Sequence, residues 1–289
     1  MKTIRIAGSL LLGAALMGGC SDRTPTALRD ASLKPSAMVL GQIDLGHPYV
    51  GAIIFDTPSP SFFPVQYQPW YCSGTLVSSR VVQTAGHCLA FAALSGGFAT
   101  PNDLPTALIH VSFAPNVTNP GSWRTVSGYV YHPAFVAPFS TFDVALVFLS
   151  QPMNDIKPGT LAPAGFLGSF NNAELQALSF SDVGYGTLGA DDNFALTGDR
   201  RIATAGFKQL DADFLNLERE PGGACYGDSG GPILLNSSGV EYVVATLHGV
   251  RTQANSNVKQ DCTGDFFTQR LDLSSVLDFI QSNIASHRP

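Results

Sequence analysis

A serine flanked by glycines stands near the end of the chain, in the run Gly227-Asp228-Ser229-Gly230-Gly231-Pro232. Glycine neighbours leave a serine hydroxyl exposed enough to act as a nucleophile, and the backbone N–H groups of such a turn can converge on a developing oxyanion. The serine also needs a histidine to take its proton and a carboxylate to orient that histidine. Both residue types occur upstream, in the runs Thr84-Ala85-Gly86-His87-Cys88 and Asp143-Val144-Ala145-Leu146. Together the three runs indicate nucleophilic catalysis.

The order histidine, aspartate, serine, with the residues around each, resembles the trypsin/chymotrypsin family of serine proteases. The resemblance covers roughly residues 42–286. It implies that Ser229 attacks a substrate carbonyl, that His87 accepts and returns the proton, and that Asp143 orients His87. It also implies an oxyanion hole made by the backbone N–H groups of Gly227 and Ser229. Three further runs support it: Cys72-Ser73-Gly74-Thr75-Leu76-Val77, His132-Pro133 and Gly184-Tyr185-Gly186.

The same resemblance implies a substrate pocket made by Gly223, Tyr226, His248, Gly249 and Asp265. Gly223 stands six residues before Ser229, where trypsin-like members carry a pocket aspartate, so a direct copy of the trypsin preference for basic side chains is not supported. Asp265 stands where a glycine of the pocket wall is usual, and there it would select Arg or Lys from a different side. If the alignment slips by one residue, Asp265 is instead a surface acid and the pocket prefers large apolar side chains.

Two positions near the site depart from the family pattern, and a third lacks its usual partner. Leu247 stands where a serine usually hydrogen-bonds the catalytic aspartate, so we expect the support of Asp143 to differ. His248 either lines the pocket or replaces an aromatic residue. In many members the residue matching Asp228 pairs with an amino terminus freed by cleavage, but no Arg or Lys directly precedes the nearest equivalent start, Met38-Val39-Leu40-Gly41. Asp228 is therefore expected to pair with an internal cation or to await cleavage by a different protease.

The five cysteines of the chain are Cys20, Cys72, Cys88, Cys225 and Cys262. An exported protein usually pairs its thiols, and setting Cys20 aside leaves four. The family resemblance implies the disulfides Cys72–Cys88 and Cys225–Cys262. A zinc site is the competing interpretation, but the sequence has no Cys-x-x-Cys pair or close Cys/His cluster. We therefore predict neither a metal nor a cofactor.

The first nineteen residues are typical of a secretory signal peptide, with Lys2 and Arg5 before an apolar run and small residues after it. The run Leu16-Met17-Gly18-Gly19-Cys20, at the end of this segment, resembles a bacterial lipobox, in which Cys20 would carry lipid and become the first residue. An ordinary signal peptide with a chance cysteine is the alternative. Residues 20–41 are rich in Pro, Ser and Thr without apolar periodicity, which predicts a tether. The protein is thus expected to be exported from a bacterium and anchored to a membrane through Cys20, facing the periplasm or the cell exterior, with release by cleavage as a further hypothesis.

Charge excludes one class of partner. The formal net charge is −6 and moves to −8 when residues 1–19, with two cations and no acids, are removed. An acidic surface without a Lys/Arg run argues against nucleic acid, so a protein or peptide substrate remains the expected partner.

The elements that must position these residues are predicted to be short strands separated by Gly, Pro, Asn and Asp. The sequence predicts two sets of six strands, which suit either two antiparallel barrels or one large sandwich. The family resemblance favours an all-β fold of two six-stranded Greek-key barrels, at about residues 42–155 and 156–272, within a protease domain of residues 42–289. Apolar residues at helical spacing predict a carboxy-terminal helix at 274–286. The predicted strands are 49–54, 74–77, 81–84, 108–113, 125–131 and 144–149, then 178–183, 201–207, 214–217, 233–235, 242–247 and 266–270.

The leading hypothesis is accordingly a serine endopeptidase that works through an acyl-enzyme intermediate. Two alternatives stay open at this point. One is a catalytically inactive homologue that binds a partner at the cell surface, and the other is an esterase-like processing enzyme with the same chemistry.

Overall fold

The computed structural model describes residues 41–288, except for 190–191, 222, 251–261 and 263. The predicted signal peptide of residues 1–19, Cys20 and the predicted tether up to residue 40 lie outside the described residues. No helix among the described residues is long and apolar enough to cross a bilayer.

The first barrel is closed by six antiparallel strands, joined in the order β2-β3-β4-β7-β6-β5. Numbering its strands one to six along the chain gives the cyclic order 1-2-3-6-5-4, a Greek-key arrangement. All six predicted strands are present, with ends that differ by a few residues. They are β2 (Val50–Phe55), β3 (Trp70–Leu76), β4 (Val81–Thr84), β5 (Ile109–Ser112), β6 (Arg124–Tyr131) and β7 (Ala145–Leu149).

The second barrel repeats this cyclic order, because its strands join as β9-β10-β13-β12-β11-β8 and a further β8–β9 pairing closes the ring. The short strand β1 (Gln42–Ile43) adds to it by pairing with β9. The two-barrel prediction is therefore confirmed, and the sandwich alternative is wrong. The strands are β8 (Ser179–Gly184), β9 (Arg201–Leu210), β10 (Phe214–Pro221), β11 (Pro232–Ser237), β12 (Val240–Val250) and β13 (Phe266–Arg270).

Strand β2 shows how the two barrels share one core. Successive side chains of a strand point to opposite faces, and every residue of β2 is buried. Ile53 and Phe55 fill the interior of the first barrel. Val50, Ala52 and Ile54 face the other way and pack in a cluster with Val183 and Leu234 of the second barrel. A strand that is apolar on both faces thus packs against the cores of both barrels.

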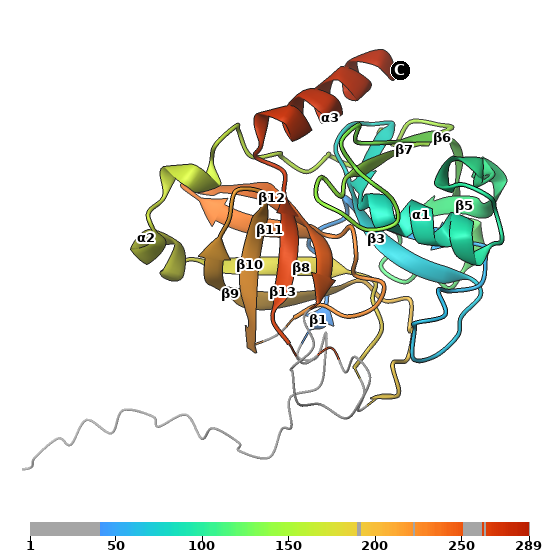
Figure 1. The fold of residues 1–289 in the computed structure, drawn as a ribbon, viewed down its shortest axis with the longest axis horizontal. Coiled ribbons are helices and arrows are strands. Elements are labelled where there is room, and N and C mark those ends of the chain that lie inside the picture. The colour runs from blue at the N-terminus through green and yellow to red at the C-terminus, as the bar shows by residue number, and fades with distance from the viewer. Residues whose placement is uncertain (1–40, 190–191, 222, 251–261, 263, 289) are drawn as a thin grey trace, which may run out of the picture. The chain divides into compact units, whose positions relative to one another are not determined.

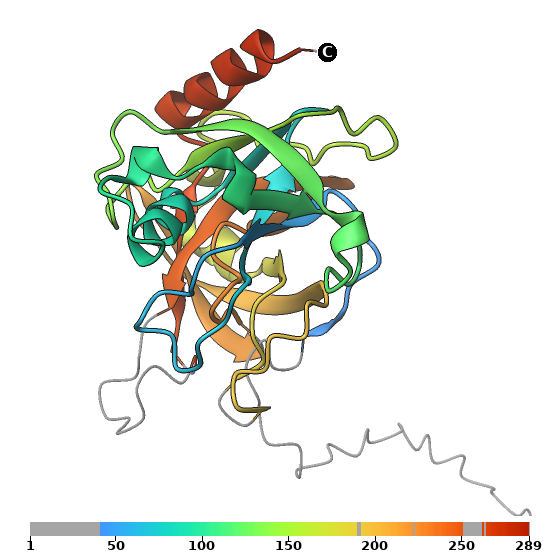
Figure 2. The ribbon, with the colours of Figure 1, turned by 90° about the vertical axis from the view of Figure 1, so that its right-hand side faces the viewer.

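Helices are few and short. The carboxy-terminal helix α3 (Ser274–Ser286) has the predicted bounds and lies outside the barrels in both ribbon views, with Val276 and Ile280 buried (Figures 1 and 2). The helix α1 (Gly86–Ser95), which follows β4, was not predicted. The other helical elements that the described residues form are α2 (Asn172–Gln176) and the 3₁₀ turns η1 (Pro101–Asp103), η2 (Thr106–Leu108), η3 (Pro120–Ser122) and η4 (Leu167–Ser169).

Candidate active site

His87 and Asp143 come together because β4 and β7 are neighbours in the first barrel. Thr84, the last residue of β4, pairs with Ala145, the first residue of β7. The segments just beyond these ends must therefore lie side by side. Gly86 allows the close approach, since a Cβ at this position would lie 3.2 Å from the Asp143 carboxylate and 3.0 Å from the Phe135 ring.

The Asp143 carboxylate holds His87 at two points. Its Oδ2 lies 2.5 Å from the ring Nδ1, and its Oδ1 accepts a hydrogen bond of 2.7 Å from the backbone N–H of His87. Asp143 is fully buried. Burial alone would raise the pKa of its carboxyl, but the neighbouring His87 and the nearby His248 together lower that pKa below its ordinary value. The carboxylate therefore stays ionised while it orients the ring.

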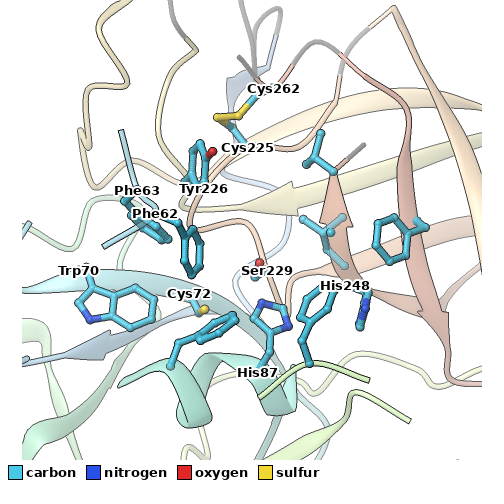
Figure 3. A pocket seen from close by; sticks show the side chains of 17 residues that line it. Phe62, Phe63, Trp70, Cys72, His87, Cys225, Tyr226, Ser229, His248 and Cys262 are labelled. Atoms are coloured by element: carbon cyan, nitrogen blue, oxygen red, sulfur yellow. A yellow bond between two sulfur atoms is a disulfide. The ribbon is translucent and has the colours of Figure 1, made fainter. Parts of the chain in front are cut away.

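Ser229 reaches the same pocket from the second barrel (Figure 3). Its backbone carbonyl accepts a hydrogen bond of 2.8 Å from the N–H of Ser73 in the first barrel. Gly230 makes this docking possible: its φ is +82°, and a Cβ there would lie 2.2 Å from Thr84 Oγ1. Within the described part of the chain no hydrogen bond joins the Ser229 hydroxyl to His87. Such bonds are often long in an unliganded enzyme and tighten when substrate binds.

The turn before Ser229 presents two backbone donors to the pocket. Gly227 has a φ of +96°, which favours glycine, and its carbonyl is held by the Ser73 hydroxyl at 2.9 Å. The N–H groups of Gly227 and Ser229 donate no hydrogen bond to any described residue. Both donors are therefore available to an oxygen atom of a ligand, which is the requirement of an oxyanion hole.

Asp228, between these donors, points away from the pocket and is fully buried. Its two oxygens accept hydrogen bonds from the N–H groups of Gly186, at 2.7 Å, and Cys225, at 2.9 Å. No ion pair to Asp228 occurs among the described residues, so backbone donors stand where an internal cation was one of the two expected partners. The other expectation, a partner freed by cleavage, stays a prediction. Burial raises the pKa of Asp228 to about 7, against the opposing effect of the two hydrogen bonds.

Asp182 on β8 is a second buried acid beside Asp228. Neither of its carboxylate oxygens has a hydrogen-bond partner among the described residues. Burial first, and then the charge of Asp228, raise the pKa of the Asp182 carboxyl well above its ordinary value. Asp182 was not among the predicted site residues, although an acid within the apolar run of residues 178–183 is a visible signal.

Two disulfides flank the site. One joins Cys72 of β3 to Cys88 of α1, directly after His87, with the Cα atoms 6.2 Å apart. The other joins Cys225, four residues before Ser229, to Cys262. Both pairs are those that the family resemblance implied. The first cross-links the histidine helix to a barrel strand and so limits its motion relative to the Ser229 turn.

The pocket has a volume of about 420 Å³ and a predominantly apolar lining. Tyr226, His248 and Gly249 line it as expected, whereas Gly223 and Asp265 do not. The Asp265 carboxylate is instead paired with Lys208 of β9. No acidic side chain lines the pocket among the described residues. Its aromatic side chains are Phe62, Phe63, Trp70, Phe91, Phe139, Tyr226 and Phe267.

Two groups of potential metal ligands occur here among the described residues, but neither is arranged to hold an ion. Cys72 and Cys88, grouped with His87, are bonded to each other and offer no thiolate. In the second group, Nδ1 of His87 and Nδ1 of His248 each lie 2.5 Å from the same Asp143 oxygen. Zinc bonds of about 2.0–2.2 Å at tetrahedral angles need ligand atoms more than 3 Å apart, so these contacts are too close.

Comparisons with known proteins agree with this geometry. The family model described as Trypsin matches residues 54–276. The CLIP domain-containing serine protease B10 of Anopheles gambiae is 24% identical over 303 residues, an alignment that covers 91% of this chain and 77% of that protein. Trypsin iota of Drosophila melanogaster is 26% identical over 189 residues, which cover 57% of this chain and 64% of that protein.

Proposed function

Because the chain belongs to the trypsin family, we propose that it is a serine endopeptidase that cleaves peptide bonds through an acyl-enzyme on Ser229. One observation carries the proposal: Asp143 holds His87 by its ring and its backbone in a pocket that Ser229 also lines. The N–H groups of Gly227 and Ser229 in the same pocket lining donate no hydrogen bond to a described residue. A nucleophile, an oriented base and an oxyanion site are the three parts that acyl transfer needs.

In the proposed reaction Ser229 Oγ bonds to the substrate carbonyl carbon while its proton passes to His87 Nε2. The carbonyl oxygen gains the negative charge and accepts hydrogen bonds from the N–H groups of Gly227 and Ser229. When the C–N bond breaks, His87 gives the proton to the departing amine. A water molecule then attacks the acyl-enzyme carbonyl and gives a proton to His87. The bond to Ser229 Oγ breaks, His87 returns the proton to that oxygen, and the carboxylic acid product leaves.

We further propose that the enzyme prefers large apolar side chains on the acyl side of the cleaved bond. The described pocket lining offers aromatic rings and no carboxylate, and Asp265 is already neutralised by Lys208. A Lys or Arg side chain entering this pocket would lose its hydration without gaining an ionic partner, which is costly. A Phe or Leu side chain would gain from the burial of its apolar surface.

Steady-state hydrolysis of matched peptide substrates with Phe, Leu, Arg or Lys at the cleaved position tests this function. We expect kcat/KM for Phe to exceed that for Arg by at least about a hundredfold, from the few kcal/mol that separate a buried ring from an unpaired buried charge. A Ser229→Ala variant serves as the inactive control. Preferred cleavage after Arg would overturn the apolar preference but leave the endopeptidase in place. No cleavage of any of these peptides, together with no cleavage of denatured casein, would favour the inactive homologue.

We also propose that the mature protein is exported and anchored through lipid on Cys20. Two disulfides support export, because such bonds persist in oxidising compartments. The amino-terminal mass of the mature protein, purified from a bacterial host, tests the anchor. A diacylated or triacylated Cys20 peptide is the expected result. A mature chain whose Cys20 carries no lipid, or that begins after Cys20, would contradict the anchor but not the proposed export.

A further inference from the structure

His248 lies at a β-bulge in the strand next to the Ser229 turn. In the pairing of β12 with β13, Leu247 is opposite Thr268 and Gly249 is opposite Phe267, so His248 has no partner across the pair. A bulge of this kind turns a side chain away from its regular direction. Leu247 packs in the core of the second barrel, and its apolar side chain has no hydrogen-bond donor to offer Asp143. The bulged residue His248 reaches it instead.

The His248 ring meets the same carboxylate oxygen that orients His87. His248 Nδ1 lies 2.5 Å from Asp143 Oδ2, and His87 Nδ1 lies 2.5 Å from that same atom. The two rings are nearly perpendicular, at 83°, with their centres 5.9 Å apart. The His248 contact lacks the geometry of a well-formed hydrogen bond, and its buried Nδ1 has no other partner among the described residues. Among the described residues, Asp143 Oδ2 is therefore the polar atom that this nitrogen faces.

Aromatic rings fix the position of His248. Its ring centre lies 4.0 Å from that of Phe139, 4.8 Å from that of Phe267 and 5.4 Å from that of Phe214. Its exposed fraction is only 3%. The charged or titratable groups that act on it are Asp143, from the segment before β7, and His87, from α1. Burial among these rings lowers the pKa of His248 more than the Asp143 carboxylate raises it, so the ring is neutral at neutral pH.

We propose that His248 is a positioning residue for Asp143, supplying through Nδ1–H the polar support that Leu247 cannot give. The inference rests on the proposed function, since its effect on rate passes through His87. As positive charge develops on His87 in the transition state, the carboxylate must stay ionised and aligned. The imidazole N–H of His248 near Oδ2 restricts rotation of the Asp143 carboxylate and stabilises the negative charge of that carboxylate. His248 itself gains and loses no proton in this scheme.

Two substitutions test the proposal kinetically. His248→Phe keeps an aromatic ring of similar size in the aromatic surroundings but removes the donor. His248→Asn places an amide N–H near the position of Nδ1. We expect His248→Phe to lower kcat ten- to hundredfold with little change in KM, as for a lost hydrogen bond to a charged group, and His248→Asn to recover most of that loss. A change in KM alone, or an equal loss in both variants, would show that His248 acts by shaping the pocket and would overturn the proposal.

A second readout does not depend on catalysis. In the Ser229→Ala background, the ¹H NMR resonance of the His87 Nδ1–H reports its hydrogen bond to Asp143. We expect this resonance to shift in His248→Phe and to return toward its original position in His248→Asn. An unchanged resonance in both variants would overturn the positioning role even if the protein proved inactive. Absence of activity in wild type, with the shift present, would instead count against the proposed function alone.

Discussion

At the scale of single residues, the geometry assigns separate tasks to the two oxygens of Asp143. Oδ1 accepts the backbone N–H of His87, and Oδ2 contacts the ring. The backbone bond holds the residue in place, while the ring contact favours the tautomer with its proton on Nδ1. In the proposed mechanism this tautomer leaves Nε2 to accept the proton of Ser229.

Asp143→Asn is predicted to separate these tasks. Its amide oxygen can still accept the backbone N–H, but its NH₂ group would face His87 Nδ1 and favour the wrong tautomer. We expect kcat to fall about 10⁴-fold with KM nearly unchanged, as steady-state kinetics on the preferred peptide would measure. Thermal unfolding of the same variant provides the control for folding. A loss below tenfold would mean that Asp143 does not orient the base.

The candidate site residues have local signatures in the sequence, whereas most of their contacts have none. Ser229, His87 and Asp143 stand in specific local runs, so the chain itself marks them. The contact of His248 with Asp143 depends on a bulge in β12, which shifts one side chain out of register and has no local signature. The Asp182–Asp228 pair was also missed, because the two acids are distant in the chain and meet only after β8 and β11 pair. The role expected of Asp265 depended on an alignment, and the structure gives Lys208 as its partner instead.

At the scale of elements, one glycine determines whether the Ser229 turn can dock on β3. Gly230 has a positive φ, and a Cβ there would meet Thr84 Oγ1 at 2.2 Å and the Ser73 carbonyl at 2.4 Å. The Ser73 backbone cannot retreat without breaking its hydrogen bond to the Ser229 carbonyl. Contacts with the first barrel therefore fix the position of the turn that carries Ser229.

Gly230→Ala and Gly239→Ala form a matched pair that tests this docking. Gly239 also has a positive φ, of +78°, but an added Cβ would meet nothing within 4 Å. We expect Gly239→Ala to cost about 1 kcal/mol of unfolding free energy, from backbone strain alone. Gly230→Ala should cost at least about 2 kcal/mol more, because it adds a steric clash in the core. Urea unfolding in the Ser229→Ala background, where self-digestion is absent, provides the measurement, and equal losses would contradict the docking.

The disulfide between β3 and α1 has a predicted energetic effect. It links residues 16 apart in sequence, and the loop-entropy relation gives about 3 kcal/mol for a loop of this size. The free energy of unfolding of the double variant Cys72→Ala with Cys88→Ala should therefore be about 3 kcal/mol lower than that of the disulfide-bonded protein. Urea unfolding at fixed pH provides the measurement. A change below about 1 kcal/mol would indicate that the unfolded chain is already compact in this region.

Strands were easier to predict than helices in this chain. All twelve barrel strands carry apolar or β-branched runs bounded by turn residues, and each was found with small errors at its ends. Helix α1 was missed because seven of its ten residues are buried, which removes the polar face that marks an amphipathic helix. Strand β1 has only two residues and exists through its pairing with β9, so no local pattern could show it.

At the scale of the whole molecule, the buried acids Asp182 and Asp228 link stability to pH. The Asp228 pKa lies at about 7 in the folded protein, above its ordinary value of 3.8, and that of Asp182 is also raised. Between about pH 4 and pH 7 the folded state thus binds more protons than the unfolded chain. Stability contributed by these groups is fully present below this window and is lost as the pH rises through it.

Asp182→Asn is predicted to reduce this pH dependence. The amide has nearly the same shape as the acid but cannot ionise, so it removes the repulsion with Asp228. We expect Asp182→Asn to stabilise the Ser229→Ala parent protein more at pH 8 than at pH 5. Thermal unfolding of both proteins at each pH provides the measurement. Asp155→Asn, at an exposed acid, is the control and should track the parent protein. A constant difference between Asp182→Asn and the parent across pH 5–8 would contradict the coupling.

The central claim is that the two barrels assemble one active nucleophile at Ser229. Covalent labelling by a fluorophosphonate, followed by mass spectrometry of the digested protein, tests it most directly, because the reagent reacts only with an activated serine. The account predicts one phosphonate per chain, located on Ser229, and none in the His87→Ala variant. Native wild-type protein that folds with both disulfides and takes up no label, or carries it on another serine, would contradict the account.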